Sequence, residues 1–244
     1  MNTKALLECL NNGPGYYSGE CFNSSKDDLL LLRKVITNHI NDILNTKHNF
    51  KINLRNKDIK NYHLTNISNF HHLLWTKRER ILPPKYINSI KKCNIFKQLL
   101  NFFPESFISN EEKIYSEEIY WRIVRPDVPS DIGSLHADSW FWPPSTKKGV
   151  NRIKVWIPIF TETGKNGFVF VPDSQKESFS YRLENTESNR IKPILIQDLS
   201  HRLEKYLGRD GNAIVFHDNL IHGGFSGGSS TRISLEFTLF VKSE

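Results

Sequence analysis

The chain has 244 residues, a formal net charge of +7, 38% hydrophobic residues and 12% aromatic residues. This composition excludes a disordered protein, and no uninterrupted apolar segment approaches the roughly 20 residues that a membrane-spanning helix requires. The three cysteines have no metal-type spacing, and the segment before Cys9 lacks the apolar region of a secretory signal. We therefore expect a cytoplasmic protein with reduced thiols.

The positive charge is spread along the chain, and its simplest interpretation is a solvated, lysine-rich surface. A basic surface can also favour the approach of anionic substrates or peripheral contact with a membrane. The sequence contains no recognisable nucleic-acid-binding motif, so we expect no nucleic acid partner. Nothing in the sequence indicates an oligomeric state.

Helical patterns dominate residues 1–114. The clearest helix is predicted over residues 24–45, where serines can cap its start and leucines and isoleucines form one stripe. A second helical region is predicted after Ser68 and ends before a pair of prolines. A third is predicted over residues 85–103, with a break near Cys93.

After residue 114 the pattern changes to short runs rich in β-branched and aromatic residues, separated by Gly, Pro and Asn turns. Because no helix alternates with these runs, they indicate an antiparallel sandwich or barrel over residues 115–244. The helical part and this core together are predicted to form one domain, residues 1–244. The predicted strands cover residues 118–125, 152–160, 167–171, 193–196, 212–217 and 231–241.

The two longest predicted strands each have one apolar face and one face that carries charges. In one arrangement the apolar faces form the core of a sandwich and the polar faces contact water. In the other, the apolar faces pack outward under the N-terminal helices, and the polar faces line a barrel mouth that holds an anionic ligand. The second arrangement gives the apolar stripes of the helices a sheet face to cover. The charged faces contain Arg152, Lys154 and Trp156 in one strand and Arg232, Ser234, Glu236 and Thr238 in the other.

The segment Ser134–Trp142 contains a histidine and a carboxylate separated by one residue, His136 and Asp138. In an extended strand these two side chains point to the same side. They suit a first-row divalent metal, and a second histidine would complete the two-histidine, one-carboxylate triad of non-haem iron(II) oxygenases. A surface pair with no metal is the alternative, so the prediction depends on a third ligand.

The third ligand is expected near the C-terminus, where His217 and His222 lie close together. A glycine-rich turn follows His222, and two antiparallel strands joined by it would bring His222 and Arg232 into one pocket. Arg232 offers a fork of donors for a carboxylate, and Ser234 on the same face can add a hydrogen bond. We predict His222 as the ligand and His217 as a supporting residue, with ligation by His217 as the alternative.

Other residues allow two interpretations. Adjacent helical residues point about 100° apart, so at most one of His71 and His72 is expected to face any given site, and both are expected in surface or packing roles. Trp140 and Trp142 can wall a substrate pocket or belong to the core. Trp156, on a charged strand face, is predicted to line the pocket.

Together these motifs resemble the phytanoyl-CoA dioxygenase-like branch of iron(II)- and 2-oxoglutarate-dependent oxygenases. The residues that carry the resemblance are His136-Ala137-Asp138, the run from Gly211 to His222, and Arg232-Ile233-Ser234. The resemblance covers residues 115–244. It implies a mainly β fold with flanking helices: a double-stranded β-helix, which is a cupin-like jelly-roll barrel, covered on one side by the N-terminal helices.

The resemblance also implies the roles of the site residues. Iron would be bound by His136, Asp138 and His222, and the distal carboxylate of 2-oxoglutarate by Arg232 with help from Ser234. The contact to the 1-carboxylate varies within the family, so the candidates here are Tyr120, Arg122 and Lys154. Asp138 implies hydroxylation or a related oxidation, because the halogenating members lack this carboxylate.

The activity implied is a dioxygenase that uses iron(II), 2-oxoglutarate and dioxygen to hydroxylate a small organic or saccharide substrate, with release of succinate and carbon dioxide. A looser resemblance to bacterial members that act on the inner-core sugar of lipopolysaccharide makes such a sugar one candidate substrate. The main alternative is a non-catalytic metal- or sugar-binding jelly roll, which has no need of Arg232 beside Asp138. A third hypothesis is an oxygenase that demethylates nucleic acids, and salt-dependent binding of nucleic acid would distinguish it from the other two.

Overall fold

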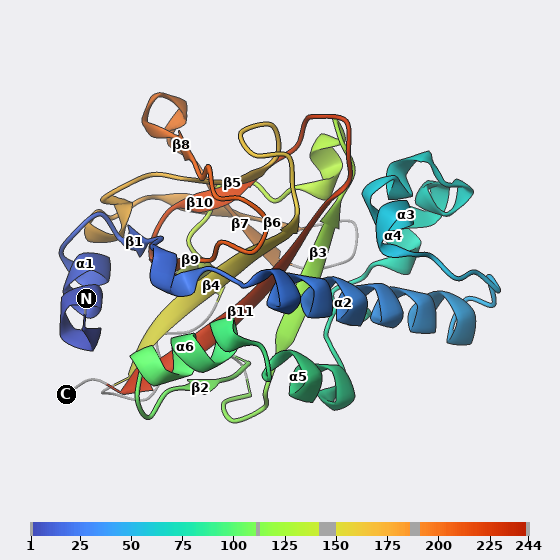
Figure 1. Ribbon diagram of the computed structural model, residues 1–244. Helices are drawn as coiled ribbons and strands as arrows, with labels where there is room; N and C mark the ends of the chain where they lie inside the picture. Colours follow the sequence, from blue (N-terminus) through green and yellow to red (C-terminus); the bar gives the residue numbers. More distant parts are fainter. Residues whose placement is uncertain (1, 111–112, 142–149, 186–190, 243–244) are drawn as a thin grey trace.

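The computed structural model describes residues 2–110, 113–141, 150–185 and 191–242, which form an antiparallel β-barrel with helices packed against one side (Figure 1). In the larger sheet, the long strand β11 (Arg232–Lys242) lies beside the other long strand, β4 (Val150–Phe160). On its other edge β11 pairs with β3 (Ile119–Val124) and then with β2 (Phe107–Ile108). Beyond β4 come β9 (Ile214–His217) and β1 (Tyr16–Tyr17).

The second sheet has the order β10-β5-β8 and consists of β10 (His222–Phe225), β5 (Gly167–Phe170) and β8 (Glu204–Lys205). A separate hairpin is formed by β6 (Tyr181–Asn185) and β7 (Ile191–Leu195). Opposed antiparallel sheets of this kind form a jelly roll, so the predicted double-stranded β-helix fold is confirmed. The strands that the pattern did not predict are β1, β2, β6, β8 and β10, which are short.

The helical layer follows the prediction most closely at its longest element, α2 (Lys26–Thr46), whose N-cap Ser25 accepts a hydrogen bond from the backbone of Asp28. The predicted third helix is divided into α5 (Pro84–Ile90) and α6 (Asn94–Phe102), with the break at Cys93. The second predicted helical region is mostly turns and 3-10 helix, with one short helix, α4 (His71–Leu74). Two further helices, α1 (Thr3–Asn11) and α3 (Asn56–Lys60), were not predicted.

Asp28 determines where α6 begins. Its carboxylate accepts hydrogen bonds from the backbone N–H groups of Asn94 at 3.0 Å and Ile95 at 3.3 Å. These donors lie in the first turn of α6, where no backbone acceptor within the helix is available to them. A carboxylate at this end is also favoured by the helix dipole. One buried side chain of α2 therefore caps the start of a second helix.

The outer face of the large sheet packs against the helices, as the second of the two predicted arrangements requires. Side chains at alternate positions of β4 and β11 join one apolar core with those of α2, α5 and α6. The ring of Phe96 on α6 stacks on that of Phe237 on β11, with centroids 5.2 Å apart. The opposite face of the same strands points into the barrel. There an inner apolar cluster, which includes Trp156, Phe168 and Phe216, lies between the two sheets.

A buried polar contact joins α2 to β3. The indole Nε1–H of Trp121 donates to Nδ1 of His39 at 3.0 Å, and both side chains are inaccessible or nearly so to solvent. Burial lowers the pKa of His39 to about 4, so the imidazole is neutral at pH 7 and can accept this hydrogen bond.

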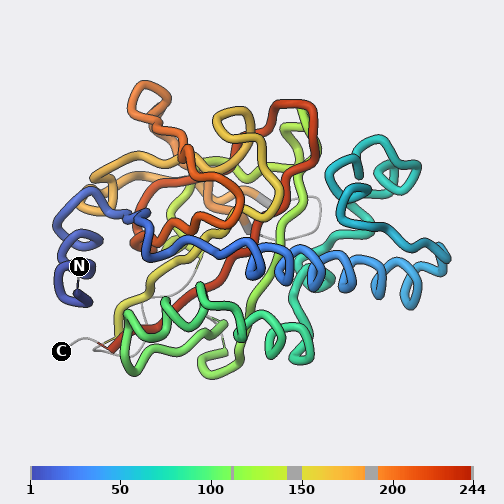
Figure 2. The backbone as a smooth tube through the Cα atoms, viewed as in Figure 1, coloured from blue at the N-terminus to red at the C-terminus, as the bar shows by residue number. Residues whose placement is uncertain are grey.

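The tube trace in Figure 2 shows α2 running along the barrel and beyond it toward the segment that contains α3 and α4. Among the helices in the described parts of the chain, none combines the length and the apolar character needed to cross a bilayer.

The buried His39 predicts a pH dependence of stability. In the unfolded chain this imidazole takes up a proton near pH 6.5, whereas in the folded protein it does so only near pH 4. Burial of the neutral His39 ring therefore adds no penalty to the free energy of unfolding above pH 6.5. As the pH falls from 6.5 toward 4, protonation of the unfolded chain lowers that free energy by at most about 1.4 kcal/mol per pH unit. We expect His39→Asn, which keeps an acceptor but does not titrate, to reduce this slope in urea unfolding.

The matched control is His48→Asn, because His48 is exposed. It should keep the wild-type slope. An unchanged slope in His39→Asn would contradict the assignment of this pH dependence to His39.

Candidate active site

Two histidines from distant parts of the chain are held together by their own backbones. His136 and His222 form an isolated antiparallel bridge, with hydrogen bonds of 3.0 Å and 2.9 Å between the N–H of each and the carbonyl of the other. Their ring centroids are 4.6 Å apart. The bridge places both imidazoles at the same point of the barrel mouth.

Each imidazole has one nitrogen occupied and the other available. Nδ1 of His136 lies 2.7 Å from the carbonyl oxygen of Ser134, and Nδ1 of His222 lies 2.9 Å from that of Leu220. A carbonyl only accepts, so in each neutral ring the hydrogen is on Nδ1 and Nε2 has the free lone pair. This is the tautomer that binds a metal through Nε2.

Asp138 completes the cluster. Its two carboxylate oxygens lie 3.6 Å from Nε2 of His136 and 3.6 Å from Nε2 of His222. The segment is not extended through this residue as predicted, because Asp138 begins a 3-10 helix, Asp138–Phe141. The turn still points the carboxylate toward both imidazoles, so the three ligand atoms of the predicted triad lie within 4.8 Å of one another.

The electrostatics of the cluster keep His222 neutral and Asp138 charged. The ring of His222 lies between those of Phe168 and Phe216, at centroid distances of 5.3 Å and 4.8 Å, and burial lowers its pKa to about 4. Burial acts to raise the pKa of Asp138, but the ammonium of Lys154 at 3.3 Å and the two imidazoles hold it well below its usual value. The site thus combines an anionic carboxylate with the neutral imidazole of His222, and His136 offers a second nitrogen donor.

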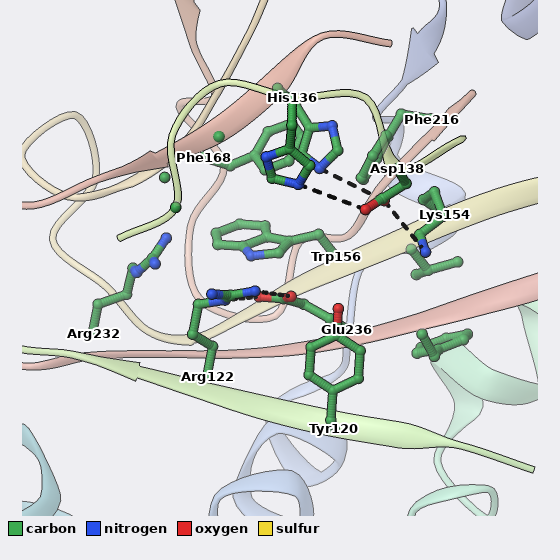
Figure 3. A pocket seen from close by; sticks show the side chains of 16 residues that line it. Tyr120, Arg122, His136, Asp138, Lys154, Trp156, Phe168, Phe216, Arg232 and Glu236 are labelled. Carbon is green, nitrogen blue, oxygen red and sulfur yellow. Dashed lines mark hydrogen bonds and ion pairs between the residues drawn. The ribbon is translucent and has the colours of Figure 1, made fainter. Parts of the chain in front are cut away.

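The cluster forms one wall of a cavity that contains about 550 Å³ of empty space between the lining atoms, including space open to solvent (Figure 3). Of the residues predicted to bind cosubstrate or substrate, Tyr120, Arg122, Lys154, Trp156 and Arg232 all line it.

Arg232 is the most unusual residue of the cavity. It is 2% exposed, its Nη1 donates to the carbonyl of Gly167, and among the described residues its Nε has no hydrogen-bond partner. Burial lowers its pKa to about 10, so the guanidinium remains charged at pH 7. A buried cation with donors to spare is costly unless an anion joins it, so the pocket is prepared for an anionic ligand.

A second guanidinium in the cavity already has a partner. Arg122 binds both oxygens of Glu236, at 3.1 Å from Nε and 3.3 Å from Nη2. Burial acts to raise the pKa of Glu236, but Arg122 lowers it to about 2. Glu236 received no role from the sequence, although it shares the inward face of β11 with Arg232. That shared face was the signal that could have identified it.

Three residues singled out in the sequence lie elsewhere. Ser234 is absent from the cavity lining, and its hydroxyl donates to Glu236 at 3.1 Å. The ring of Trp140 stacks on that of Tyr181, with centroids 4.7 Å apart, and Trp140 also does not line the cavity. His217 accepts a hydrogen bond from the backbone of Asn219 and does not join the cluster. Trp142 lies outside the residues that the structure describes.

The comparison with known families agrees with this geometry. The family described as phytanoyl-CoA dioxygenase (PhyH) matches residues 45–233, which is more than half of the chain. No curated protein sequence matches the chain.

Several solved structures share the fold at low sequence identity. EvdO2 from Micromonospora carbonacea var. aurantiaca has a TM-score of 0.54 and 10% identity, and the match covers 66% of this chain and 66% of EvdO2. EctD from S. alaskensis, solved with 2-oxoglutarate and 5-hydroxyectoine, has a TM-score of 0.52 and 15% identity over 97% of this chain and 76% of EctD. SnoK, an alpha-ketoglutarate-dependent carbocyclase from nogalamycin biosynthesis, has a TM-score of 0.51 and 13% identity over 99% of this chain and 84% of SnoK.

Because the family match spans most of the chain, including all three residues of the triad, the chain belongs to the phytanoyl-CoA dioxygenase family of iron(II)- and 2-oxoglutarate-dependent oxygenases.

Proposed function

We propose that this protein is a dioxygenase that uses iron(II), 2-oxoglutarate and dioxygen to hydroxylate a small organic or saccharide substrate. The observation that carries the proposal is that one cavity holds both the His136–Asp138–His222 cluster and the buried guanidinium of Arg232, whose Nε has no hydrogen-bond partner among the described residues. A metal-binding jelly roll without catalytic activity would need the cluster alone. Two structural neighbours, EctD and EvdO2, have been solved with 2-oxoglutarate.

The residues fit iron(II). Two imidazole Nε2 atoms and one carboxylate form the donor set of the facial triad, and their Nδ1–H groups are already bound to carbonyls, which fixes the ring orientation. A bound iron(II) supplies the oxidative chemistry, in which decarboxylation of 2-oxoglutarate to succinate and carbon dioxide is coupled to hydroxylation of the substrate. The protein holds the donors, orients the cosubstrate and limits access of water.

Arg232 is proposed to bind the distal carboxylate of 2-oxoglutarate. In Figure 3 its guanidinium lies to the left of the Trp156 ring, and Asp138 lies on the opposite side of the view. A dicarboxylate that reaches from the cluster to Arg232 would satisfy the donor left without a partner. The hydroxyl of Ser234 donates to Glu236, so Ser234 would help to position that carboxylate and would not contact the cosubstrate directly.

Of the three candidates for the 1-carboxylate, we propose Lys154. Its ammonium lies 3.3 Å from Asp138 and donates to Thr238 at 2.7 Å, so it is next to the ligand cluster. Arg122 is bound on two nitrogens by Glu236 and lies farther from the cluster in Figure 3. Tyr120 lines the cavity with a hydroxyl whose pKa is raised by burial, so it is a neutral donor.

The substrate is proposed to bind in the same cavity as the cosubstrate and to enter through its opening to solvent. Asp138 favours hydroxylation, as the family resemblance implies. The lining combines aromatic rings with the Arg122–Glu236 pair, which suits a small molecule with both apolar and polar groups. Within this class an acidic saccharide, such as a lipopolysaccharide inner-core sugar, is the narrower hypothesis.

The cluster predicts a spectroscopic signature. Anaerobic addition of iron(II) and 2-oxoglutarate should produce a weak visible charge-transfer band that requires both components. His222→Ala removes one of the imidazole donors and should abolish the band at cosubstrate levels that saturate the wild type. The neighbouring His217→Ala is the matched control and should retain the band. A band that survives in His222→Ala, or is absent from folded wild-type protein, would refute the proposed site.

The second prediction concerns Arg232. Replacement by Ala removes a charge-assisted contact worth about 1.5–3 kcal/mol, so the 2-oxoglutarate concentration for half-maximal band formation should rise roughly tenfold or more. Iron(II) binding without cosubstrate should change little, because Arg232 does not touch the cluster.

The control is the double variant Arg122→Met/Glu236→Gln, which removes the other guanidinium together with its partner and so leaves no unpaired charge. Its requirement for 2-oxoglutarate should remain within a few-fold of the wild type. If it rises as strongly as in Arg232→Ala, Arg122 also anchors the cosubstrate and the assignment of roles is wrong.

A further inference from the structure

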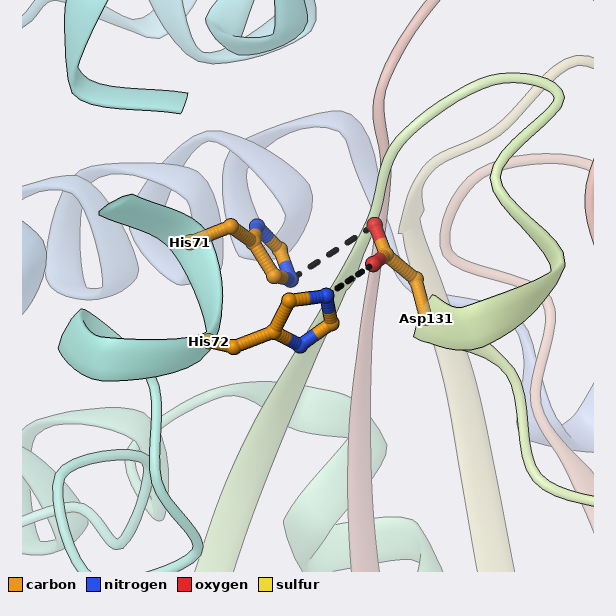
Figure 4. Close-up of side chains that lie close together, drawn as sticks. All are labelled: His71, His72 and Asp131. Carbon is orange, nitrogen blue, oxygen red and sulfur yellow. Dashed lines mark ion pairs between the residues drawn. The ribbon is translucent and has the colours of Figure 1, made fainter. Parts of the chain in front are cut away.

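A second group of potential metal ligands lies outside the cavity, between α4 and the loop after β3 (Figure 4). Nε2 of His71 is 3.5 Å from one carboxylate oxygen of Asp131, and Nε2 of His72 is 3.6 Å from the other. The expectation that at most one of these histidines faces a given site was wrong. His71 and His72 are the first two residues of the short helix α4. Their rings converge on Asp131, whose carboxylate turns one oxygen toward each of them (Figure 4).

The spacing of these groups is that of ligands around an ion. Hydrogen bonds between nitrogen and oxygen measure about 2.7–3.2 Å, so neither imidazole makes a normal hydrogen bond to Asp131. Donors at about 2.0–2.1 Å from a tetrahedral zinc ion lie roughly 3.4 Å from one another. The 3.6 Å between Nε2 of His72 and the oxygen that it faces is close to that value, and one ligand atom from each of the three residues lies within 4.8 Å of the others.

The protonation states also suit a cation. Burial lowers the pKa of His71 to about 4, so its ring is neutral at pH 7. Burial acts to raise the pKa of Asp131, but hydrogen bonds from Arg125 and the nearby His71 lower it, so the carboxylate is ionised. The side chain of Asp131 is fully buried, whereas that of His72 is 63% exposed and leaves a path from solvent.

Arg125 is the group that opposes a cation here. Its backbone N–H and Nε donate to one oxygen of Asp131 at 2.9 Å and 2.8 Å, and its Nη2 donates to the other at 2.8 Å. A carboxylate accepts about four hydrogen bonds, so three are used and one position remains on the oxygen that faces His72. Nη2 also lies 3.3 Å from Nε2 of His72, and an ion bound to His72 would have to replace this contact. The guanidinium orients the carboxylate but repels the ion, so binding should be weaker than at a structural zinc site.

We propose that His71, His72 and Asp131 form a second site for a divalent transition metal ion of the zinc, cobalt or nickel class, separate from the catalytic cavity. Two imidazoles and one carboxylate are the donors that such ions accept, and water would complete the coordination. The ion would link α4 to the loop that leads from β3 to His136. The proposal does not depend on the proposed oxygenase activity.

The test separates the two sites. In the variant His136→Ala/His222→Ala the cavity lacks its imidazoles, and titration with Co²⁺ followed by visible absorption and calorimetry should still detect one bound ion. Adding His72→Ala should weaken this binding at least tenfold. His72 is the residue to change because it is largely exposed, so the fold should be retained. Equal thermal unfolding of the two variants without metal would verify this.

The matched control is His201→Ala in the same background, since His201 is an exposed histidine elsewhere on the surface. It should bind Co²⁺ as the background does. In the otherwise wild-type chain, the stoichiometry should fall from two ions to one with His72→Ala, which keeps the test valid if the double variant does not fold. Absence of a second ion in the wild type, or binding that is unchanged by His72→Ala, would overturn the proposal.

Discussion

The paired backbone hydrogen bonds between His136 and His222 are the constraint on which the catalytic site depends. They join the loop that carries His136 to β10, an edge strand of the smaller sheet, and they are made by the backbones of the two ligand residues themselves. The relative position of the two rings is therefore set by the backbone and not by contacts between flexible side chains. At Gly223, next to the bridge, a Cβ atom would lie 3.2 Å from a methyl group of Leu135, so a larger residue would require that side chain to shift. Rigid backbone support of this kind is what a preorganised metal site requires.

The inner face of the barrel combines this constraint with an unusual density of buried charge. Asp138 is compensated by Lys154, and Glu236 by Arg122, whereas Arg232 keeps a donor without a partner among the described residues. Burial without a partner lowers stability. The cavity is therefore less favourable when empty than when an anion occupies the end near Arg232, which is a common compromise at functional sites.

Much of the fold could be predicted because strand side chains alternate. The parity of β4 and β11 separates a face that packs on the helices from a face that lines the cavity, and the structure confirms that assignment. The triad residues could be proposed because few residue types bind iron. His222 and Arg232 do share one cavity as expected, but β10 and β11 belong to different sheets, so the glycine-rich segment between them is not a hairpin turn. The remaining features depend on contacts between distant segments. These include the 3-10 turn at Asp138, the hydrogen bond that holds Ser234 on Glu236, and the convergence of His71 and His72 on Asp131.

The carboxylate of Asp28 has a consequence for how the protein opens. It belongs to the first turn of α2 but accepts hydrogen bonds from the start of α6, across a sequence separation of 66 residues for Asn94. Closing a loop of that length costs conformational entropy, and this contact offsets the cost only while α2 is intact. Loss of α2 therefore also removes the cap of α6, so local opening of α2 should loosen the first turn of α6 as well.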